Sequence, residues 1–307
     1  MTVVLAVVCS ASFGKVSIPF MKEKKFDGRG LRLVKILEKN PAYTKYYITY
    51  MSDRFKISGI MDVPKGKGPY PVIITAHGYI DPKVYTNGRG LKREQDYFAR
   101  RGFVVLHPDY RNHAGSDKDE SQNLSLHIGY TEDVINAVYA VKKSGLKFID
   151  NSRIGLLGHS MGGLIGLNIM VIEPGLVNAY VLFAPMSIDY RDNFNRWILR
   201  RKEPKYGRRE TAMKIIAMYG SPEANPGFWN NISVKSFVSD VTAPVQLHHG
   251  TADESVPYEW SQELVKALKD KGKDVQFYSY EGERHEFIRR WPAVMKRATE
   301  FFDRELR

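Results

Sequence analysis

The stretch Ile154-Gly155-Leu156-Leu157-Gly158-His159-Ser160-Met161-Gly162 decides the fold of this chain. Its apolar start is typical of a buried strand, and its end fits G-x-S-x-G, the pattern of a sharp turn from a strand into a helix. The glycines are needed because the backbones beside such a turn come too close for a Cβ atom. Further glycines follow at Gly163 and Gly166. A plain helix cap would not need them, so the context predicts that the turn presents the Ser160 hydroxyl as a nucleophile.

From Tyr43 onward, short β-rich runs alternate with longer amphipathic runs. Strands are predicted at 43–50, 55–63, 72–75, 103–106, 154–157, 177–183, 245–248 and 275–280, and helices at 91–101, 131–143, 161–172, 258–271 and 292–305. This alternation predicts an α/β fold: a mainly parallel sheet with helices on both faces. The first two strands form an N-terminal hairpin, which would add an antiparallel edge.

One segment, residues 187–237, breaks the alternation. It is highly charged and contains helical stretches at 194–201 and 210–218. A loop of that length without structure is unusual in a compact domain. We therefore interpret it as a helical cap inserted into a single domain at 43–307, and residues 1–42 as an N-terminal extension.

The N-terminus contains the apolar run Val3–Cys9, followed by small residues. This resembles the end of a secretory signal, which slightly favours a secreted or periplasmic location over a cytoplasmic one. A basic start is missing, however, and a buried strand would have the same composition. Cys9 is the single cysteine, so an intrachain disulfide scaffold and a thiolate metal cluster are excluded.

The net charge of +12 comes mainly from two segments of the chain. Residues 1–67 hold 13 basic and 5 acidic residues, and residues 187–237 hold 10 and 5, while the remainder is nearly balanced. Solvated surface is the simplest interpretation, and an anionic substrate or surface is the alternative. Nucleic-acid binding is not expected, because the basic residues are not interleaved with aromatic RNA-binding motifs. No apolar run is long enough for a membrane span.

A serine nucleophile needs a base, and in this architecture the order along the chain is Ser, acid, His. His285 lies in a polar loop between the last strand and the last helix, where it can reach the top of the sheet. Asp253 follows the preceding strand and is preferred over Glu254, because its short side chain after a glycine turn is more readily fixed. A helix cap is the alternative role for Asp253. His248 and His249 are interpreted as packing or hydrogen-bonding residues beneath the acid loop.

A tetrahedral intermediate needs two N–H donors. The first is predicted to be the backbone N–H of Met161, directly after the nucleophile. The second is assigned to Tyr79 N–H, in the loop after the third strand, where Gly78 lets the backbone turn inward. His77 is interpreted as a structural histidine.

The spacing of the residues argues against other kinds of active site. His285-Glu286 begins like the zinc-protease motif H-E-x-x-H, but Arg289 occupies the second ligand position. His107, Asp109 and His113 share one loop without further clustered ligands. Neither a dinucleotide nor a phosphate-loop pattern is present. We therefore expect no metal and no cofactor.

These motifs resemble the α/β-hydrolase superfamily over about residues 43–307. The chain is most similar to the branch with the prolyl-oligopeptidase catalytic domain, the dienelactone hydrolases and carboxylesterases such as feruloyl and acetyl-xylan esterases. The matching segments are His77-Gly78-Tyr79, Pro108–Arg111, Gly158–Gly163, Ala243–Asp253 and Gly282–Phe287. The resemblance implies an α/β-hydrolase fold, Ser160, Asp253 and His285 as a triad, and Tyr79 and Met161 as oxyanion donors.

The sequence thus predicts a serine carboxylester hydrolase that acts on a small-molecule ester through an acyl-enzyme. The alternatives are an aminopeptidase or amidase of the prolyl-oligopeptidase-like group, and a non-catalytic binding protein of the same fold. About 70 residues before the third strand are too few for the β-propeller of prolyl oligopeptidases. Trp197, Phe228 and Trp229 are candidates for an acyl or aromatic pocket, or for the core of the cap. Basic cap residues such as Arg200 and Arg201 are candidates for attracting acidic saccharide esters.

Overall fold

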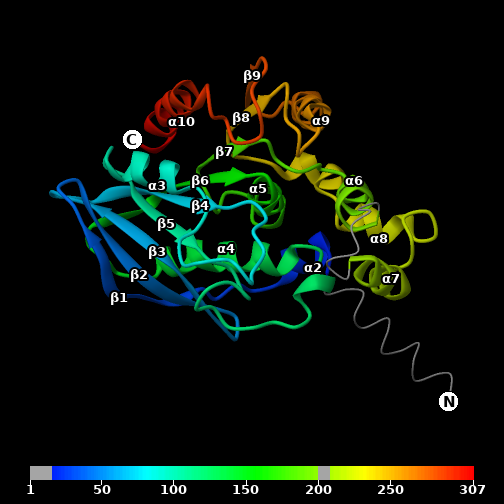
Figure 1. Cartoon of the computed structure of the whole chain (residues 1–307), viewed down its shortest axis with the longest axis horizontal. Coiled ribbons are helices and arrows are strands. Elements are labelled where there is room, and N and C mark those ends of the chain that lie inside the picture. Colours follow the sequence, from blue (N-terminus) through cyan, green and yellow to red (C-terminus); the bar gives the residue numbers. More distant parts are fainter. Residues whose placement is uncertain (1–15, 200–207) are drawn as a thin grey trace.

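The structure is a computed structural model that describes residues 16–199 and 208–307 (Figure 1). The apolar run Val3–Cys9 and the basic residues Arg200 and Arg201 lie outside the described residues. Within the described ranges, no helix combines the length and the apolar character that crossing a membrane requires.

The centre of the molecule is a sheet of nine strands in the order β1-β2-β3-β5-β4-β6-β7-β8-β9. The first three strands pair antiparallel, and β3 also pairs antiparallel with β5. From β5 to β9 all neighbours are parallel. The strands are β1 Arg29–Lys39, β2 Tyr43–Ser52, β3 Phe55–Pro64, β4 Tyr70–Ala76, β5 Val104–Pro108, β6 Ile149–His159, β7 Ala179–Phe183, β8 Val245–Gly250 and β9 Val275–Tyr280. The predicted mainly parallel sheet with an antiparallel hairpin is confirmed.

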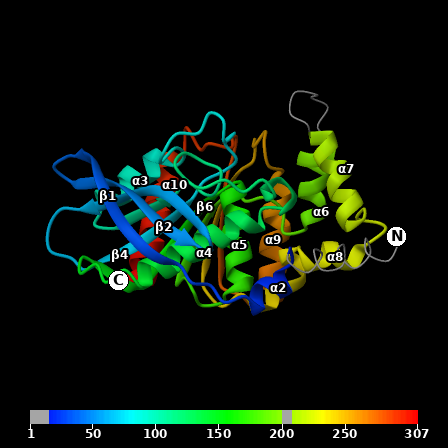
Figure 2. The ribbon, with the colours of Figure 1, turned by 90° about the horizontal axis from the view of Figure 1, so that it is seen from below.

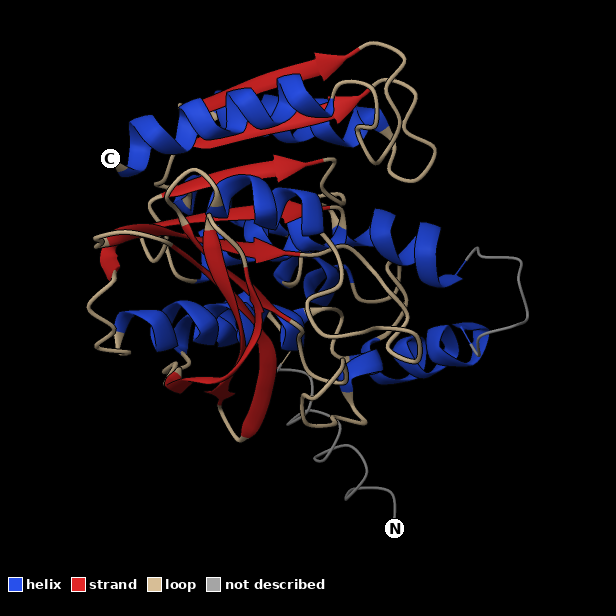
Figure 3. Ribbon diagram, turned by 60° about the vertical axis from the view of Figure 1, so that its left-hand side comes forward, coloured by secondary structure: helices blue, strands red, loops and turns tan. Residues whose placement is uncertain are grey.

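Helices cover both faces of the parallel part (Figures 1 and 3). In β4, Val72 and Ile74 belong to one apolar core and Ile73 to the other, as expected for a strand buried on both faces. The first core includes residues of α4 (Ile128–Lys142), α5 (Met161–Ile172) and α9 (Tyr258–Asp270), and the second includes residues of α3 (Lys92–Ala99) and α10 (Trp291–Leu306). This layering is the α/β architecture that the alternation predicted, and it agrees with the hydrolase fold that the resemblance implies.

Residues 1–42 contain structure that the sequence analysis did not anticipate. Within them, β1 is the edge strand beside β2, with three shifts in its pairing register. The short helix α2 (Ile18–Glu23) buries Ile18 and Met21 in the first core, against α5 (Figure 2). The sheet therefore extends across residue 42.

The described part of the inserted segment at 187–237 is mainly helical. It comprises α6 (Tyr190–Asn193), a π-helical turn (Phe194–Leu199), α7 (Arg208–Tyr219) and α8 (Pro226–Asn231), followed by a 3₁₀ segment (Val234–Asp240). The arrowheads of the parallel strands point toward the side on which these helices lie (Figure 3). The predicted cap therefore lies beside the carboxyl ends of the strands, where α/β folds bind ligands.

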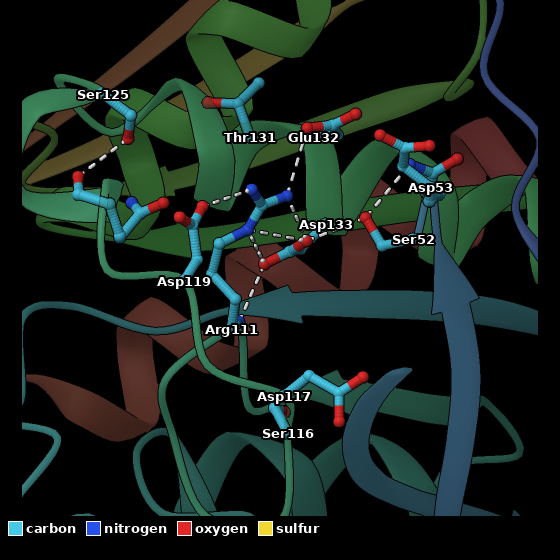
Figure 4. A network of polar contacts seen from close by, with 12 residues as sticks. Ser52, Asp53, Arg111, Ser116, Asp117, Asp119, Ser125, Thr131, Glu132 and Asp133 are labelled. Carbon is cyan, nitrogen blue, oxygen red and sulfur yellow. Dashed lines mark hydrogen bonds and ion pairs between the residues drawn. The ribbon is translucent and has the colours of Figure 1, made fainter. Parts of the chain in front are cut away.

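A buried arginine fixes the loop that follows β5. Arg111 is 4% exposed, and its guanidinium contacts three carboxylates: Asp133 at 2.8 Å, Asp119 at 3.0 Å and Glu132 at 3.1 Å (Figure 4). Asp133 also accepts a 2.8 Å hydrogen bond from Ser52 at the end of β2. Each buried charge thus has several partners, which is the condition under which burying it is tolerated. The network ties the loop to α4 and to the antiparallel edge.

Asp62 on β3 is a buried carboxylate with few interactions that would stabilise its negative charge. Its side chain is fully buried, and both oxygens lack a hydrogen-bond partner among the described residues. Lys45 Nζ, on the neighbouring strand, lies 3.7 Å away, which is longer than a hydrogen bond. Burial raises the pKa of Asp62 to about 7, and the nearby charges of Glu38 and Asp96 add to the increase while Lys45 opposes it.

We predict that Asp62→Asn changes the pH dependence of stability. With a pKa of about 7 when folded and about 3.9 when unfolded, the wild-type carboxyl binds its proton more tightly in the folded state. Its contribution to stability is therefore full below about pH 4 and is lost as the pH rises to about 7. Urea unfolding should show the variant gaining on the order of 2–4 kcal/mol on wild type between these limits.

The matched control for this prediction is Asp270→Asn, because that carboxylate is 57% exposed. Its stability should follow wild type across the pH range. An identical pH dependence for wild type and Asp62→Asn would contradict the prediction.

Candidate active site

Ser160 stands at the turn between β6 and α5 in a strained conformation. Its φ is 57° and its ψ is −117°, a left-handed backbone that non-glycine residues rarely adopt. The glycines around it have no room for a side chain. A Cβ on Gly158 would lie 2.4 Å from Gly162 O, one on Gly162 would lie 1.9 Å from Ala76 O, and one on Gly163 would lie 2.6 Å from Pro185 Cβ. Close packing of the neighbouring segments therefore requires the sharp turn that the sequence motif predicted.

The loop after β4 packs directly against Ser160. A Cβ on Gly78 would lie 3.2 Å from the Cβ of Ser160. Two buried histidines hold the carbonyl groups of this loop: His77 Nδ1 is 2.7 Å from Gly78 O, and His113 Nε2 is 3.1 Å from Ile80 O. His77 also stacks on Tyr110, with 4.1 Å between the ring centroids. His77 is thus placed as a structural residue, as predicted, whereas the part of His113 was not recognised from the sequence.

The two predicted oxyanion donors belong to the two segments next to the serine. Met161 is the first residue of α5, where backbone N–H groups have no partner within the helix, and Tyr79 lies in the loop after β4. Tyr79, Ser160 and Met161 line the same cavity. The assignment of their N–H groups as oxyanion donors remains a prediction.

His285 and Asp253 meet, although 32 residues separate them. His285 Nδ1 lies 2.7 Å from Asp253 Oδ2, and the carboxylate is fully buried. The other oxygen, Oδ1, accepts hydrogen bonds from the backbone N–H groups of Ser255 and Val256, both at 2.8 Å. With Nδ1–H donated to the carboxylate, the lone pair of the imidazole is left on Nε2, the tautomer that a general base requires.

Burial by itself would raise the pKa of Asp253. The hydrogen bonds from His249 and His285 outweigh burial and hold that pKa below its usual range. His249 Nε2 lies 3.1 Å from the same oxygen that contacts His285, and His249 Nδ1 lies 2.6 Å from Ser261 Oγ. Asp253 is therefore ionised at neutral pH. His249 has the hydrogen-bonding role beneath the acid loop that the sequence analysis assigned to it.

The loops that carry the acid and the histidine are joined through their backbones. Ala252 N–H donates to Glu283 O at 3.0 Å, and Thr251 N–H donates to Tyr280 O at 3.0 Å. A Cβ on Gly250 would lie 2.2 Å from Glu283 O, so the two chains are in close contact. These contacts fix the Asp253–His285 pair before any substrate binds.

A cavity of 1210 Å³ lies at the carboxyl ends of the strands, and both Ser160 and His285 line it. Trp197 of the cap is in its wall, as the sequence analysis proposed. Phe228 and Trp229 are not in the wall, because they form the core of the cap. Phe228 stacks on Tyr219 at 4.4 Å, and Trp229 is fully buried with its Nε1–H donated to Gly220 O.

One group of described residues has metal-ligand chemistry at this place. Ligand atoms of His159, His285 and Glu286 lie within 4.8 Å of one another. His159 Nε2 is 3.2 Å from His285 O, and the two rings lie 4.5 Å apart. A cation bound there would contact the imidazole of His285, which Asp253 orients. The chemistry of His285 therefore suits either a general base or a metal ligand.

Comparison with known proteins assigns the chain to a family. The model of the prolyl oligopeptidase family matches residues 89–307, a stretch that includes Ser160, Asp253 and His285. The chain belongs to the prolyl oligopeptidase family. It is a serine hydrolase of that family, so the predicted resemblance and fold are confirmed.

Proteins similar to this family member include several named as peptidases and the structure of Est1E with ferulic acid bound. It is 25% identical over 243 residues to the uncharacterized peptidase YtmA of Bacillus subtilis, covering 79% of this chain and 86% of that protein. The putative dipeptidyl aminopeptidase IV of Bacteroides ovatus has a TM-score of 0.69 at 20% identity. Est1E of Butyrivibrio proteoclasticus, solved with ferulic acid bound, has a TM-score of 0.63 at 21% identity.

The matches to the two solved structures cover different shares of those proteins. The Bacteroides match covers 87% of this chain but 37% of that one, so this chain spans under half of the dipeptidyl aminopeptidase. The Est1E match covers 84% of this chain and 98% of that one.

We predict that Gly162→Ala destabilises the fold by about 3 kcal/mol, since the added methyl would meet a backbone oxygen that cannot move away. Denaturant unfolding measures the loss. The control is Gly227→Ala in α8, where the added methyl contacts only Asn225 Oδ1 at 3.9 Å. Equal unfolding midpoints for the two variants would refute the steric account of the turn.

Proposed function

We propose that this protein is a serine peptidase that cleaves amide bonds in small peptides or acylated amino acids through Ser160, His285 and Asp253. The observation that carries the proposal is the 2.7 Å contact between His285 Nδ1 and a buried, ionised Asp253, in a cavity that Ser160 also lines. The family match and the peptidase names of its relatives favour amide bonds over the ester bonds expected from sequence. Tight fixation of the acid–histidine pair suits amides, whose poor leaving groups depend on general acid catalysis.

In the proposed reaction, His285 Nε2 takes the proton from Ser160 Oγ as the oxygen attacks the carbonyl carbon. Asp253 holds the ring in position and stabilises the imidazolium. The N–H groups of Met161 and Tyr79 hold the oxyanion. His285 then gives the proton to the leaving amine, and water hydrolyses the acyl-enzyme with the same histidine as base.

A carboxylester hydrolase is the second candidate. It is supported by the likeness to Est1E, which this chain matches over nearly the whole of that protein. The reaction steps are the same, with an alcohol as the leaving group. The two candidates differ in which leaving group the site tolerates.

The role of Ser160 is tested by labelling. A fluorophosphonate should label the wild type at one serine and fail to label Ser160→Ala, and turnover should fall by about 10³-fold or more. The matched control, Ser239→Ala, changes an exposed serine and should label as wild type does. Full labelling of Ser160→Ala would refute the proposed nucleophile.

The choice between amide and ester is tested with one uncharged acyl group presented as a 4-nitroanilide, as a dipeptide and as a 4-nitrophenyl ester. A peptidase should turn over all three in a reaction that Ser160→Ala abolishes. Asp253→Asn should slow the amides by about 10³–10⁴-fold, because the imidazole loses its tautomer. Turnover of the ester alone would contradict the peptidase proposal and favour the second candidate.

A further inference from the structure

The position of His285 divides the cavity into two sides. Because the histidine gives its proton to the leaving group, that group must lie next to the His285 loop, and the acyl group must lie on the opposite side of Ser160. The residues of the cavity wall nearest the His285 loop come from that loop, from the start of α10 and from α3. Figure 1 shows α3 and α10 beside each other on one face of the sheet.

We take the acyl side of the cavity to be the wall formed by the loop before α4 and by the cap, with residues such as Leu126, His127, Met186, Tyr190 and Trp197. In the described part of the chain, these two segments contribute no charged side chain to the wall. His127 is the one titratable base among these, and burial lowers its pKa to about 4. Tyr190 Oη lies 2.6 Å from its Nδ1. This side is therefore built for an uncharged acyl group.

On the leaving-group side, the charged guanidinium of Arg93 is held in place by its neighbours. The Arg93 guanidinium lies over the Trp291 ring, 5.3 Å from its centroid, and Nη2 donates to Glu286 O at 2.9 Å. Glu286 directly follows His285. Trp291 is held in turn, because its Nε1–H donates at 2.6 Å to Glu94, which is 3% exposed. The Arg93 guanidinium is thus held against Glu286, the residue that follows His285 in the chain.

The guanidinium keeps donors available for a ligand. Within residues 16–199 and 208–307, Nε and Nη1 of Arg93 have no hydrogen-bond acceptor, and the side chain is 47% exposed. Its nearest carboxylate, Glu94, lies 3.5 Å from Nη2. Lys83, Arg89 and Lys92 also line the cavity, as do the carboxylates of Asp81 and Glu286. A guanidinium is always charged, and its remaining N–H groups can donate charge-assisted hydrogen bonds to a carboxylate.

We propose that Arg93 binds a carboxylate on the leaving group, so that the preferred substrates join an uncharged acyl group to an amino acid or short peptide that ends in a free carboxylate. The inference rests on the proposed function, because it uses His285 to decide where the leaving group lies. Trp291 and the backbone carbonyl of Glu286 hold Arg93 in place. Arg93 is a specificity-determining residue in this account.

Two aryl esters test the inference independently of the amide question. They share one uncharged acyl group, and their leaving groups are 4-hydroxybenzoate, which carries a carboxylate, and 4-hydroxybenzamide, which does not. Each kcat/KM is divided by the rate of hydroxide-catalysed hydrolysis of the same ester, which removes the intrinsic difference between the leaving groups. Wild type should prefer the benzoate by about tenfold, and added salt should reduce this preference.

Arg93→Gln should bring the ratio close to one, and Arg93→Lys should retain part of the preference. The matched control is Arg100→Gln, which changes an arginine at the other end of α3 that pairs with Asp96. It should keep the wild-type ratio. A ratio near one in wild type, or a ratio that Arg93→Gln leaves unchanged, would overturn the inference while the proposed function stands. If neither ester nor any peptide is hydrolysed in a Ser160-dependent reaction, the proposed function fails, and this inference fails with it.

Discussion

The turn at Ser160 depends on a steric constraint: several backbone segments converge where only glycine fits. The missing side chains of Gly158, Gly162 and Gly163 let the start of α5 approach the end of β4 and the Pro185 segment. This close approach holds Ser160 at a positive φ. It also brings the loop carrying Tyr79 against the serine, so one constraint positions both the serine and this loop. Strain of this kind persists because the packing around it leaves no alternative.

The parts of the fold that follow a simple periodicity were predictable from the sequence. Strands buried on both faces, such as β4, read as short apolar runs, and α5 and β9 have the bounds that their patterns indicated. The meeting of His285 with Asp253 was also predictable, because parallel strands bring their carboxyl ends to one edge of the sheet. Local pattern combined with a known topology was sufficient in these cases.

Other features depend on contacts that no local pattern encodes. The strand β1 is mostly exposed and has no clear alternation, so its sequence resembled an extension. Phe228 and Trp229 have the composition of a pocket wall, and only the packing of the cap shows that they face inward. The support of the loop by His113, and the stacking of Arg93 on Trp291, join residues that are distant along the chain. Such pairs require the tertiary structure.

The edge strand β1 also bears on how the molecule behaves at high concentration. An unpaired strand edge is a template for another chain, and this one exposes Val34, Ile36 and Leu37. Its irregular register and the cations Arg32 and Lys35 oppose a flat, self-matching association. Among the described residues, this edge therefore combines exposed apolar side chains with the charge and irregular pairing that oppose association with another chain.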